Sequence, residues 1–163
     1  MIELVQKVEP ELIGRLVQLE TEAFGEGGMN EWHLVPLIRH GRVYIFRQDQ
    51  AVLGAVQYML DWENPHKAYM VGVSIAQESR GQGIGGKLLQ GSFNDLAKAN
   101  ITEVELTCDS NNIVAVKLYE SKFGFLVTES RLNEYGEGED RLVMKLLLAN
   151  VVNSATDSKA RDQ

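Results

Sequence analysis

Residues 80–89, Arg-Gly-Gln-Gly-Ile-Gly-Gly-Lys-Leu-Leu, constrain the fold of this chain more than any other segment. A hydrophobic stretch over residues 69–76 precedes them, and apolar residues at helical spacing follow over residues 84–97. A strand, a glycine-dense turn and a helix together point free backbone N–H groups and a helix N-terminus at an anion. Glycine has no Cβ, so the main chain can approach phosphate oxygens closely. Arg80 adds a positive guanidinium at the mouth of the turn. The segment therefore predicts a site for a phosphate-bearing ligand.

Two well-known phosphate-binding turns fit this segment only in part. Residues 81–87 match the G-x-x-x-x-G-K of a P-loop, but Leu88 stands where a serine or threonine would ligate magnesium. Residues 81–86 also match G-x-G-x-x-G, the fingerprint of dinucleotide-binding domains. That turn leaves its strand directly, whereas residues 77–80 intervene here, and too little chain follows for a doubly wound domain.

A third pattern, Arg-x-x-Gly-x-Gly, is matched at every position by Arg80, Gly83 and Gly85. It is the pyrophosphate loop of acetyl-CoA-dependent N-acetyltransferases. For the loop alone, a glycine-rich turn without a ligand remains the alternative. A second segment matches Asn-x-x-Ala-x-x-Leu-Tyr followed by Gly-Phe, through Asn112, Ala115, Leu118, Tyr119, Gly124 and Phe125. With both motifs in this order, the chain resembles the GNAT acetyltransferase superfamily.

The resemblance covers residues 1 to about 149 and implies an α/β fold of the GNAT acyl-CoA N-acyltransferase type. That fold has a mixed, mostly antiparallel sheet of about seven strands flanked by four helices. Periodicity in the sequence gives the order β, α, α, β, β, β, α, β, α, β, β, which is also the order in this family. We expect one domain over residues 1–149 and a polar, disordered C-terminal tail over residues 150–163.

Several local elements can be placed from spacing and turn chemistry. Apolar residues at helical spacing predict helices over residues 11–24, 84–100 and 112–122. Asn30 is a predicted N-cap of a further, short helix. A hairpin is expected about residues 48–50.

The resemblance also implies where acetyl-CoA binds. The main chain of residues 81–86 would hold the pyrophosphate, and residues 73–75 of the preceding strand would offer backbone groups to the pantetheine arm. The predicted cofactor-binding residues are Val73, Ser74, Ile75, Arg80, Gly81, Gln82, Gly83, Ile84, Gly85, Gly86 and Asn112. For residues 73–75 the alternative is an ordinary buried strand. Asn112 is also expected to act as an N-cap, and the two roles are compatible.

Tyr119 is the predicted catalytic residue. The tyrosine at this motif position protonates the departing thiolate in the family that the chain resembles. A phenol with an ordinary pKa of about 10 can donate to a thiolate whose conjugate acid has a pKa of about 8.5. The alternative is an aromatic side chain on the core face of its helix.

The general base is harder to assign. Residues 131–135 and 139–144 resemble the ribosomal-protein alanine acetyltransferase branch, in which a glutamate lies twelve residues before the tyrosine. Here that position is Thr107, which cannot accept the proton of an amine, and this departure puts a peptide substrate in doubt. The candidate substitutes are Glu22, Glu26, Asp61, Glu63, His66 and Glu105. For each of them a solvated surface charge is the alternative.

Loops on a fixed scaffold commonly set selectivity, and three are candidates here: residues 25–32, residues 61–67 and the turn around Tyr135. The predicted substrate residues are Glu22, Glu26, Trp32, Asp61 and Tyr135. Trp62 is a further aromatic that could wall a pocket for a cation. For these aromatic side chains the alternative is anchoring in the core.

The amino-acid composition limits the classes of partner that the protein is expected to bind. The formal net charge is −7 and the isoelectric point is near 5.0, which argues against nucleic acid and favours a cationic acceptor. No apolar run approaches the ~20 residues of a membrane span, and the N-terminus has no secretory signal pattern, so we expect a cytoplasmic protein. Cys108 is the single cysteine, which excludes an internal disulfide and a cysteine-based metal site; no metal is expected.

Taken together, the sequence predicts an acetyl-CoA-dependent N-acetyltransferase that acetylates a primary amine directly, without a covalent enzyme intermediate. The favoured acceptor is a small cationic molecule, with a protein N-terminal or lysine amine second. A non-catalytic acyl-CoA-binding sensor is the rival, supported by Thr107 and opposed by Tyr119. A nucleotide-binding protein is third. The expected partners are acetyl-CoA and the amine, and a homodimer is left open.

Overall fold

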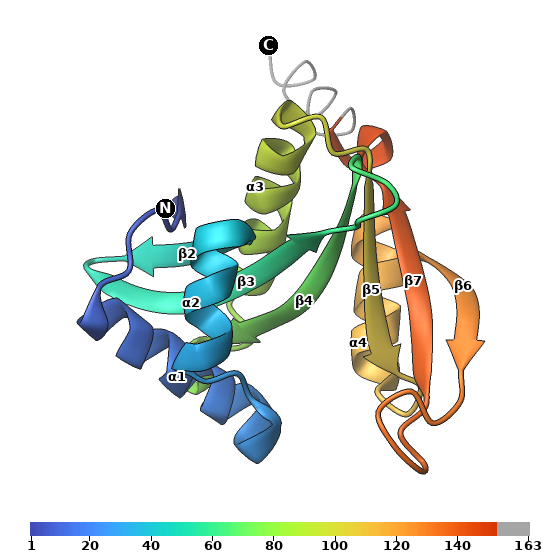
Figure 1. Cartoon of the computed structure of the whole chain (residues 1–163), viewed down its shortest axis with the longest axis horizontal. Helices are drawn as coiled ribbons and strands as arrows, with labels where there is room; N and C mark the ends of the chain where they lie inside the picture. The colour runs from blue at the N-terminus through green and yellow to red at the C-terminus, as the bar shows by residue number, and fades with distance from the viewer. Residues whose placement is uncertain (153–163) are drawn as a thin grey trace. The chain divides into compact units, whose positions relative to one another are not determined.

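The computed structural model describes residues 1–152 (Figure 1). Within these residues the strands and α-helices follow one another in the order predicted from the sequence. They form a seven-stranded sheet with the strand order β1-β2-β3-β4-β5-β7-β6. The β4–β5 pair is parallel, whereas the β1–β2, β2–β3, β5–β7 and β6–β7 pairs are antiparallel. The predicted α/β fold with a mixed, mostly antiparallel sheet is confirmed.

The bounds of the elements are as follows. The strands are β1 (Ile2–Leu4), β2 (Arg42–Gln48), β3 (Ala51–Leu60), β4 (Lys67–Ile75), β5 (Glu103–Asp109), β6 (Leu126–Arg131) and β7 (Arg141–Leu147). The α-helices are α1 (Pro10–Phe24), α2 (Glu31–His40), α3 (Ile84–Lys98) and α4 (Ile113–Leu118). Two 3-10 turns, η1 (Gly25–Gly27) and η2 (Gln77–Ser79), and one π-helical turn, η3 (Tyr119–Phe123), complete this set.

The C-terminal end of the described chain differs from the prediction. Residues 148–152 are α-helical, so the described chain has one α-helical segment more than the four predicted helices. Most of the predicted tail, residues 153–163, lies outside the described residues. No helix within residues 1–152 is long and apolar enough to cross a membrane.

The chain divides into two compact units. The first contains Met1–Leu60 and Met70–Ser92, and the second contains Asp61–Tyr69 and the chain from Phe93 onward. β4 and α3 each contribute residues to both units.

In the first unit, both faces of the β2–β3 hairpin are covered. Four successive residues of β2, from Val43 to Phe46, are buried, which requires cover on both sides because side chains alternate along a strand. Figure 1 shows α1 and α2 on one side of the hairpin and α3 on the other. The shared core contains Val5, Ile13, Leu16, Leu19, Leu34, Ile38, Val43, Ile45, Val52, Ala55 and Ala76. Each fully buried leucine among them contributes about 2 kcal/mol by leaving water.

Local chemistry explains the predicted turn and cap of this unit. Asp49 and Gln50 both have positive φ, 46° and 71°, as a two-residue hairpin turn with the twist of its strands requires. Asn30 accepts a hydrogen bond from the Trp32 N–H at 3.0 Å and caps α2, as predicted. Its own N–H donates to Nδ1 of His33 at 3.3 Å, which completes a capping box.

In the second unit, α4 is shorter than predicted. The helix expected over residues 112–122 is α-helical only to Leu118 and continues as the π-helical turn η3. Gly124, with a φ of 78°, ends this turn, and the Phe125 N–H donates back to the Tyr119 carbonyl at 3.2 Å. The aromatic rings of Phe123 and Phe125 pack against Phe93, with ring centroids 5.4 and 6.1 Å away.

Candidate active site

The glycine loop has a conformation that only glycine adopts easily. Gly81 and Gly83 have φ values of 77° and 76°, which would cost another residue about 1–2 kcal/mol each. A Cβ at either position would meet no atom within 4 Å, so the space in front of the loop is open. The first recorded hydrogen bond at the start of α3 runs from the Lys87 N–H to the Gly83 carbonyl at 3.1 Å. The N–H groups of residues 84–86 are therefore available to an anion.

Arg80 braces this loop. Its Nε donates to the Ile75 carbonyl at 3.2 Å and its Nη2 donates to the Glu22 carbonyl at 3.1 Å. The guanidinium thus joins the end of β4 to the last turn of α1, while its charge stays at the mouth of the loop. Its role as a cofactor ligand remains a prediction, and the structure adds a positioning role.

Glu22, a predicted substrate residue, has partners within the first unit. Its Oε2 accepts the Gln77 N–H at 3.2 Å, and its Oε1 lies 3.6 Å from Nη1 of Arg15. The carboxylate therefore holds η2 against α1, just before the glycine loop. A contact with substrate stays a prediction.

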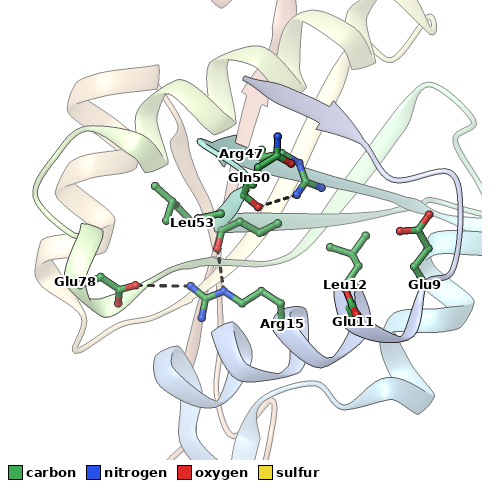
Figure 2. Close-up of a pocket in the computed structure, with 10 residues that line it drawn as sticks. Glu9, Glu11, Leu12, Arg15, Arg47, Gln50, Leu53 and Glu78 are labelled. Atoms are coloured by element: carbon green, nitrogen blue, oxygen red, sulfur yellow. Dashed lines mark hydrogen bonds and ion pairs between the residues drawn. The ribbon is translucent and has the colours of Figure 1, made fainter.

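A pocket of about 450 Å³ opens between α1 and the turn of the β2–β3 hairpin (Figure 2). Arg15 crosses it, donating from Nε to the Val52 carbonyl at 2.9 Å and pairing through Nη2 with Glu78 at 3.8 Å. Its lining consists of Glu9, Glu11, Leu12, Arg15, Arg47, Gln50, Ala51, Val52, Leu53 and Glu78. None of the sequence-predicted site residues lines it, so we assign its charged groups to holding α1 against the hairpin and η2.

The strand predicted to hold the pantetheine arm is only partly paired with β5. The β4–β5 register runs over Lys67–Tyr69 with Glu103–Glu105, and residues 73–75 lie beyond this ladder. Val73 and Ile75 are partly exposed, whereas Ser74 is buried. Contact of these residues with the cofactor stays a prediction.

Tyr119 belongs to the second unit and opens the π-helical turn. It is 9% exposed, and its ring packs edge-on against Phe125 with 5.5 Å between centroids. Burial, with a smaller effect from the nearby Cys108, raises the pKa of Tyr119 to about 12. Its hydroxyl has no hydrogen-bond partner within the described residues. The phenol is therefore protonated at neutral pH and has a proton to give.

Thr107 occupies the position at which the related branch has its glutamate. Its Oγ1 lies 3.0 Å from the Tyr69 hydroxyl, so the two side chains share a hydrogen bond. Burial raises the pKa of Tyr69 to about 12, an effect that the bond to Thr107 only partly opposes. Neither group can accept a proton from an amine near neutral pH.

These two tyrosines predict a loss of stability in alkali. An unfolded tyrosine ionises near pH 10, whereas Tyr69 and Tyr119 hold their protons to about pH 12 when folded. Between these values the unfolded chain binds fewer protons than the folded chain, so the free energy of unfolding falls as pH rises. Urea denaturation from pH 8 upward should show this decline, and it should be shallower in Tyr69→Phe and Tyr119→Phe. Equal slopes in all three proteins would contradict the assignment.

Asn112 caps α4, as predicted. Its Oδ1 accepts the Ala115 N–H at 3.2 Å. Its contact with the cofactor stays a prediction.

Removing this cap should destabilise the second unit. Asn112→Ala should lower the free energy of unfolding by about 1 kcal/mol, because the Ala115 N–H loses its acceptor. Asn111→Ala is the matched control, since Asn111 is exposed and only its backbone N–H takes part, bonding to Asp109. Thermal unfolding compares them, and equal stability of the two variants would show that the cap contributes nothing.

The residues predicted to bind the acceptor differ in their surroundings. Trp32, Trp62 and Tyr135 are 79%, 99% and 63% exposed, so they do not anchor a core. Arg141 lies over the Tyr135 ring, with its Cζ 5.0 Å from the centroid. Glu26 is exposed in η1. Contacts of these residues with substrate stay predictions.

Asp61 is fixed by its own loop. Its Oδ1 accepts the N–H groups of Glu63 and Asn64 at 2.9 Å each, and its Oδ2 lies 3.4 Å from Nζ of Lys67. The bonds from Asn64 and Glu63, followed by the charge of Lys67, lower the pKa of Asp61. A carboxylate held in this way is a poor proton acceptor.

Two other substitutes for the base also have partners. Glu105 is 7% exposed and pairs with Lys67 at 2.9 Å and with Lys145 at 3.6 Å. Nδ1 of His66 lies 2.9 Å from the Asn100 carbonyl.

Glu20 in α1, which is 1% exposed, was not among the residues predicted from the sequence. Burial raises its pKa, and this effect outweighs those of its neighbours Met29, Ser74 and Gln57. The sequence does place Glu20 on the apolar face of α1, because it follows Ile13 and Leu16 at helical spacing.

Within residues 1–152 there is no group of three or more His, Cys, Asp or Glu side chains that could hold a metal ion.

The chain matches a known protein family in sequence. Residues 10–125 match the family model described as the acetyltransferase (GNAT) family. A comparison with curated protein sequences gives no significant match.

Solved structures share the fold at low sequence identity. The ribosomal-protein-S18-alanine N-acetyltransferase from Escherichia coli superposes with a TM-score of 0.74 at 19% identity, covering 91% of this chain and 94% of that one. Ard1 from Thermoplasma volcanium gives 0.77 at 16% identity, covering 90% and 97%. An aminoglycoside 6'-N-acetyltransferase complexed with coenzyme A gives 0.75 at 13% identity, covering 91% and 97%.

The family match spans well over half of the chain and includes both the glycine loop and the segment around Tyr119. The element order and the mixed sheet agree with it. The chain therefore belongs to the GNAT family of acetyltransferases.

Proposed function

We propose that this protein is an acetyl-CoA-dependent N-acetyltransferase that moves the acetyl group directly to a primary amine. The observation that carries the proposal is the glycine loop. Two positive-φ glycines, the free N–H groups at the start of α3 and the braced Arg80 form an anion site of the kind that holds a diphosphate. Its family membership supports acetyl-CoA as the co-substrate.

The proposed chemistry needs no covalent enzyme intermediate. The neutral amine attacks the thioester carbonyl carbon, a C–N bond forms, and the C–S bond breaks with its electron pair going to sulfur. Tyr119 supplies a proton to the departing thiolate, for which its protonated phenol is suited. Main-chain amides of residues 81–86 bind the diphosphate.

The favoured acceptor is a small cationic amine. The net charge of −7 and the carboxylates in the loops at residues 25–32 and 61–67 favour a cation. An N-terminal or lysine amine of a protein is the second candidate, favoured by the exposed aromatic side chains of Trp32, Trp62 and Tyr135, which could stack on a peptide.

Two measurements test the proposal. Titration calorimetry with coenzyme A should show saturable binding, and thiol release from acetyl-CoA should rise with at least one amine in a panel. The panel contains a polyamine, an aminoglycoside, an alanyl peptide and a lysyl peptide. Binding without thiol release for any amine would favour the acyl-CoA sensor, and no binding would exclude both functions.

A further inference from the structure

Glu20 is a buried carboxylate whose contacts are all with neutral groups. Its Oε2 accepts the Met29 N–H at 3.2 Å, and its Oε1 accepts Nε2 of Gln57 at 3.2 Å. Ser74 lies beside it on β4. Within residues 1–152, no Lys, Arg or His forms an ion pair with this carboxylate. A buried carboxylate without a cation is costly, and a positive partner would offset this cost.

Two more oxygen atoms at this place have no well-formed hydrogen bond, although the Ser74 hydroxyl lies against the Glu20 carboxylate. Oε1 of Gln57 and Oγ of Ser74 are buried and make no hydrogen bond of acceptable geometry. Gln57 is 0% exposed and Ser74 is 1% exposed, so water does not reach these side chains freely. Buried polar atoms are nearly always paired in folded proteins, and an unpaired one needs an explanation, such as a catalytic role or a bound ion or water.

The unpaired oxygen of Gln57 faces a cradle at Gly72. A Cβ placed on Gly72 would lie 3.4 Å from Oε1 of Gln57, 3.8 Å from Cε of Met29 and 4.0 Å from Cε2 of Phe24. Gly72 is partly exposed, although Met70 and Ser74 on the same face of β4 are buried. The absent side chain therefore leaves a small space with an acceptor oxygen on one side and apolar atoms on the other.

We propose that Glu20, Gln57 and Ser74 bind the amino group of the acceptor beside Gly72, and that Glu20 is the base that takes its proton. A primary ammonium carries three N–H donors and one positive charge, which matches these acceptor oxygens and the uncompensated carboxylate. This inference rests on the proposed function and supplies the base that Thr107 cannot provide.

The proton balance of the step is simple. The ammonium gives one proton to the Glu20 carboxylate, and the neutral amine attacks the thioester carbon. As the C–S bond breaks, the nitrogen loses a second proton to solvent, and Tyr119 gives its proton to the sulfur and regains one from solvent. Glu20 then returns its proton to solvent, so the products are the amide, coenzyme A as the thiol and one released proton. Burial raises the pKa of Glu20, which makes it a stronger base than an exposed glutamate.

Binding can be tested apart from catalysis. Methylammonium chloride, with equimolar sodium chloride as the salt control, should shift the backbone amide NMR signals of Gly72 and Met29 in the wild-type chain. Gly72→Ala should abolish the shift, because the new methyl group fills the cradle while its nearest neighbour stays at 3.4 Å, an ordinary contact. Gly14→Ala is the matched control, since a Cβ there meets no atom within 4 Å. Equal shifts in both variants, or none in the wild type, would overturn the inference.

Kinetics test the base. With the best amine of the panel, Glu20→Gln should lower kcat about 100-fold and regain rate as pH approaches the pKa of the amine. A purely structural role would not give this recovery. Since Met29, Gln57 and Ser74 do not titrate near neutral pH, Glu20 is the titrating group of this cluster, and Glu20→Gln should change the acidic limb of the wild-type pH profile. Glu11→Gln, on the exposed part of α1, should leave the rate unchanged.

The outcomes separate the two proposals. Wild-type rates and an unchanged pH profile in Glu20→Gln and Gly72→Ala would overturn this inference and leave the acetyltransferase function intact. If the wild-type chain binds no coenzyme A or releases no thiol, the proposed function fails and this inference fails with it. Should Glu20→Gln not fold, as judged by circular dichroism, Gly72→Ala decides the matter through turnover at unchanged coenzyme A affinity.

Discussion

Tyr119→Phe is expected to lower turnover about 100-fold while leaving the affinity for coenzyme A nearly unchanged. The substitution removes one hydroxyl and keeps the ring that packs against Phe125 at 5.5 Å, so the second unit should fold as before. The lost group is the proposed proton donor to the thiolate. Stopped-flow thiol release gives turnover, and calorimetry gives affinity.

The pH dependence sharpens this expectation. Since burial raises the pKa of Tyr119 to about 12, the donor stays protonated over the range in which amine acceptors become neutral. The wild-type rate should therefore not fall through ionisation of Tyr119 below about pH 11. An unchanged turnover in Tyr119→Phe would remove this residue from the mechanism, whereas a weakened affinity would reveal a role in binding instead.

Arg80→Glu is expected to weaken coenzyme A binding about 100-fold, or a few kcal/mol. The change breaks the bonds to the Ile75 and Glu22 carbonyls and puts a negative charge beside the diphosphate. The loss is limited because the main-chain donors of residues 81–86 remain.

Two controls accompany this variant in the same calorimetric titration. Lys7→Glu makes the same change of charge at an exposed position and should bind coenzyme A as the wild type does. Arg80→Lys keeps the charge but not the planar fork, so its affinity should lie between the wild-type and Arg80→Glu values. If Arg80→Glu binds as tightly as Lys7→Glu, the loop holds its shape without Arg80.

The order of the helices and strands could be predicted from the sequence because apolar residues recur with the helical or the strand period in each amphipathic segment. α1, the β2–β3 hairpin and the cap at Asn30 depend on residues close together in the chain. The π-helical turn after Leu118 could not be predicted, since it accompanies tertiary packing: Phe123 and Phe125 pack against Phe93, and Tyr119 packs against Phe125.

The residues of the candidate site could be predicted from the sequence only where they belong to a motif. The glycine loop carries its chemistry in consecutive residues. The cluster of Glu20, Gln57 and Ser74 does not, because it joins one helix to two strands far apart in the sequence. The exposure of Trp32, in the first turn of α2, and of Trp62, in a loop, could not be predicted either, since an aromatic residue at such a place can be buried or exposed.

The bracing by Arg80 has a kinetic consequence. The carbonyl that it holds in α1 belongs to Glu22, only two residues beyond Glu20. Arg80 therefore connects the proposed diphosphate site to the helical turn that carries Glu20. On the proposed function, binding of coenzyme A at the loop should then favour binding of the amine, and product-inhibition patterns should show the thioester entering before the amine.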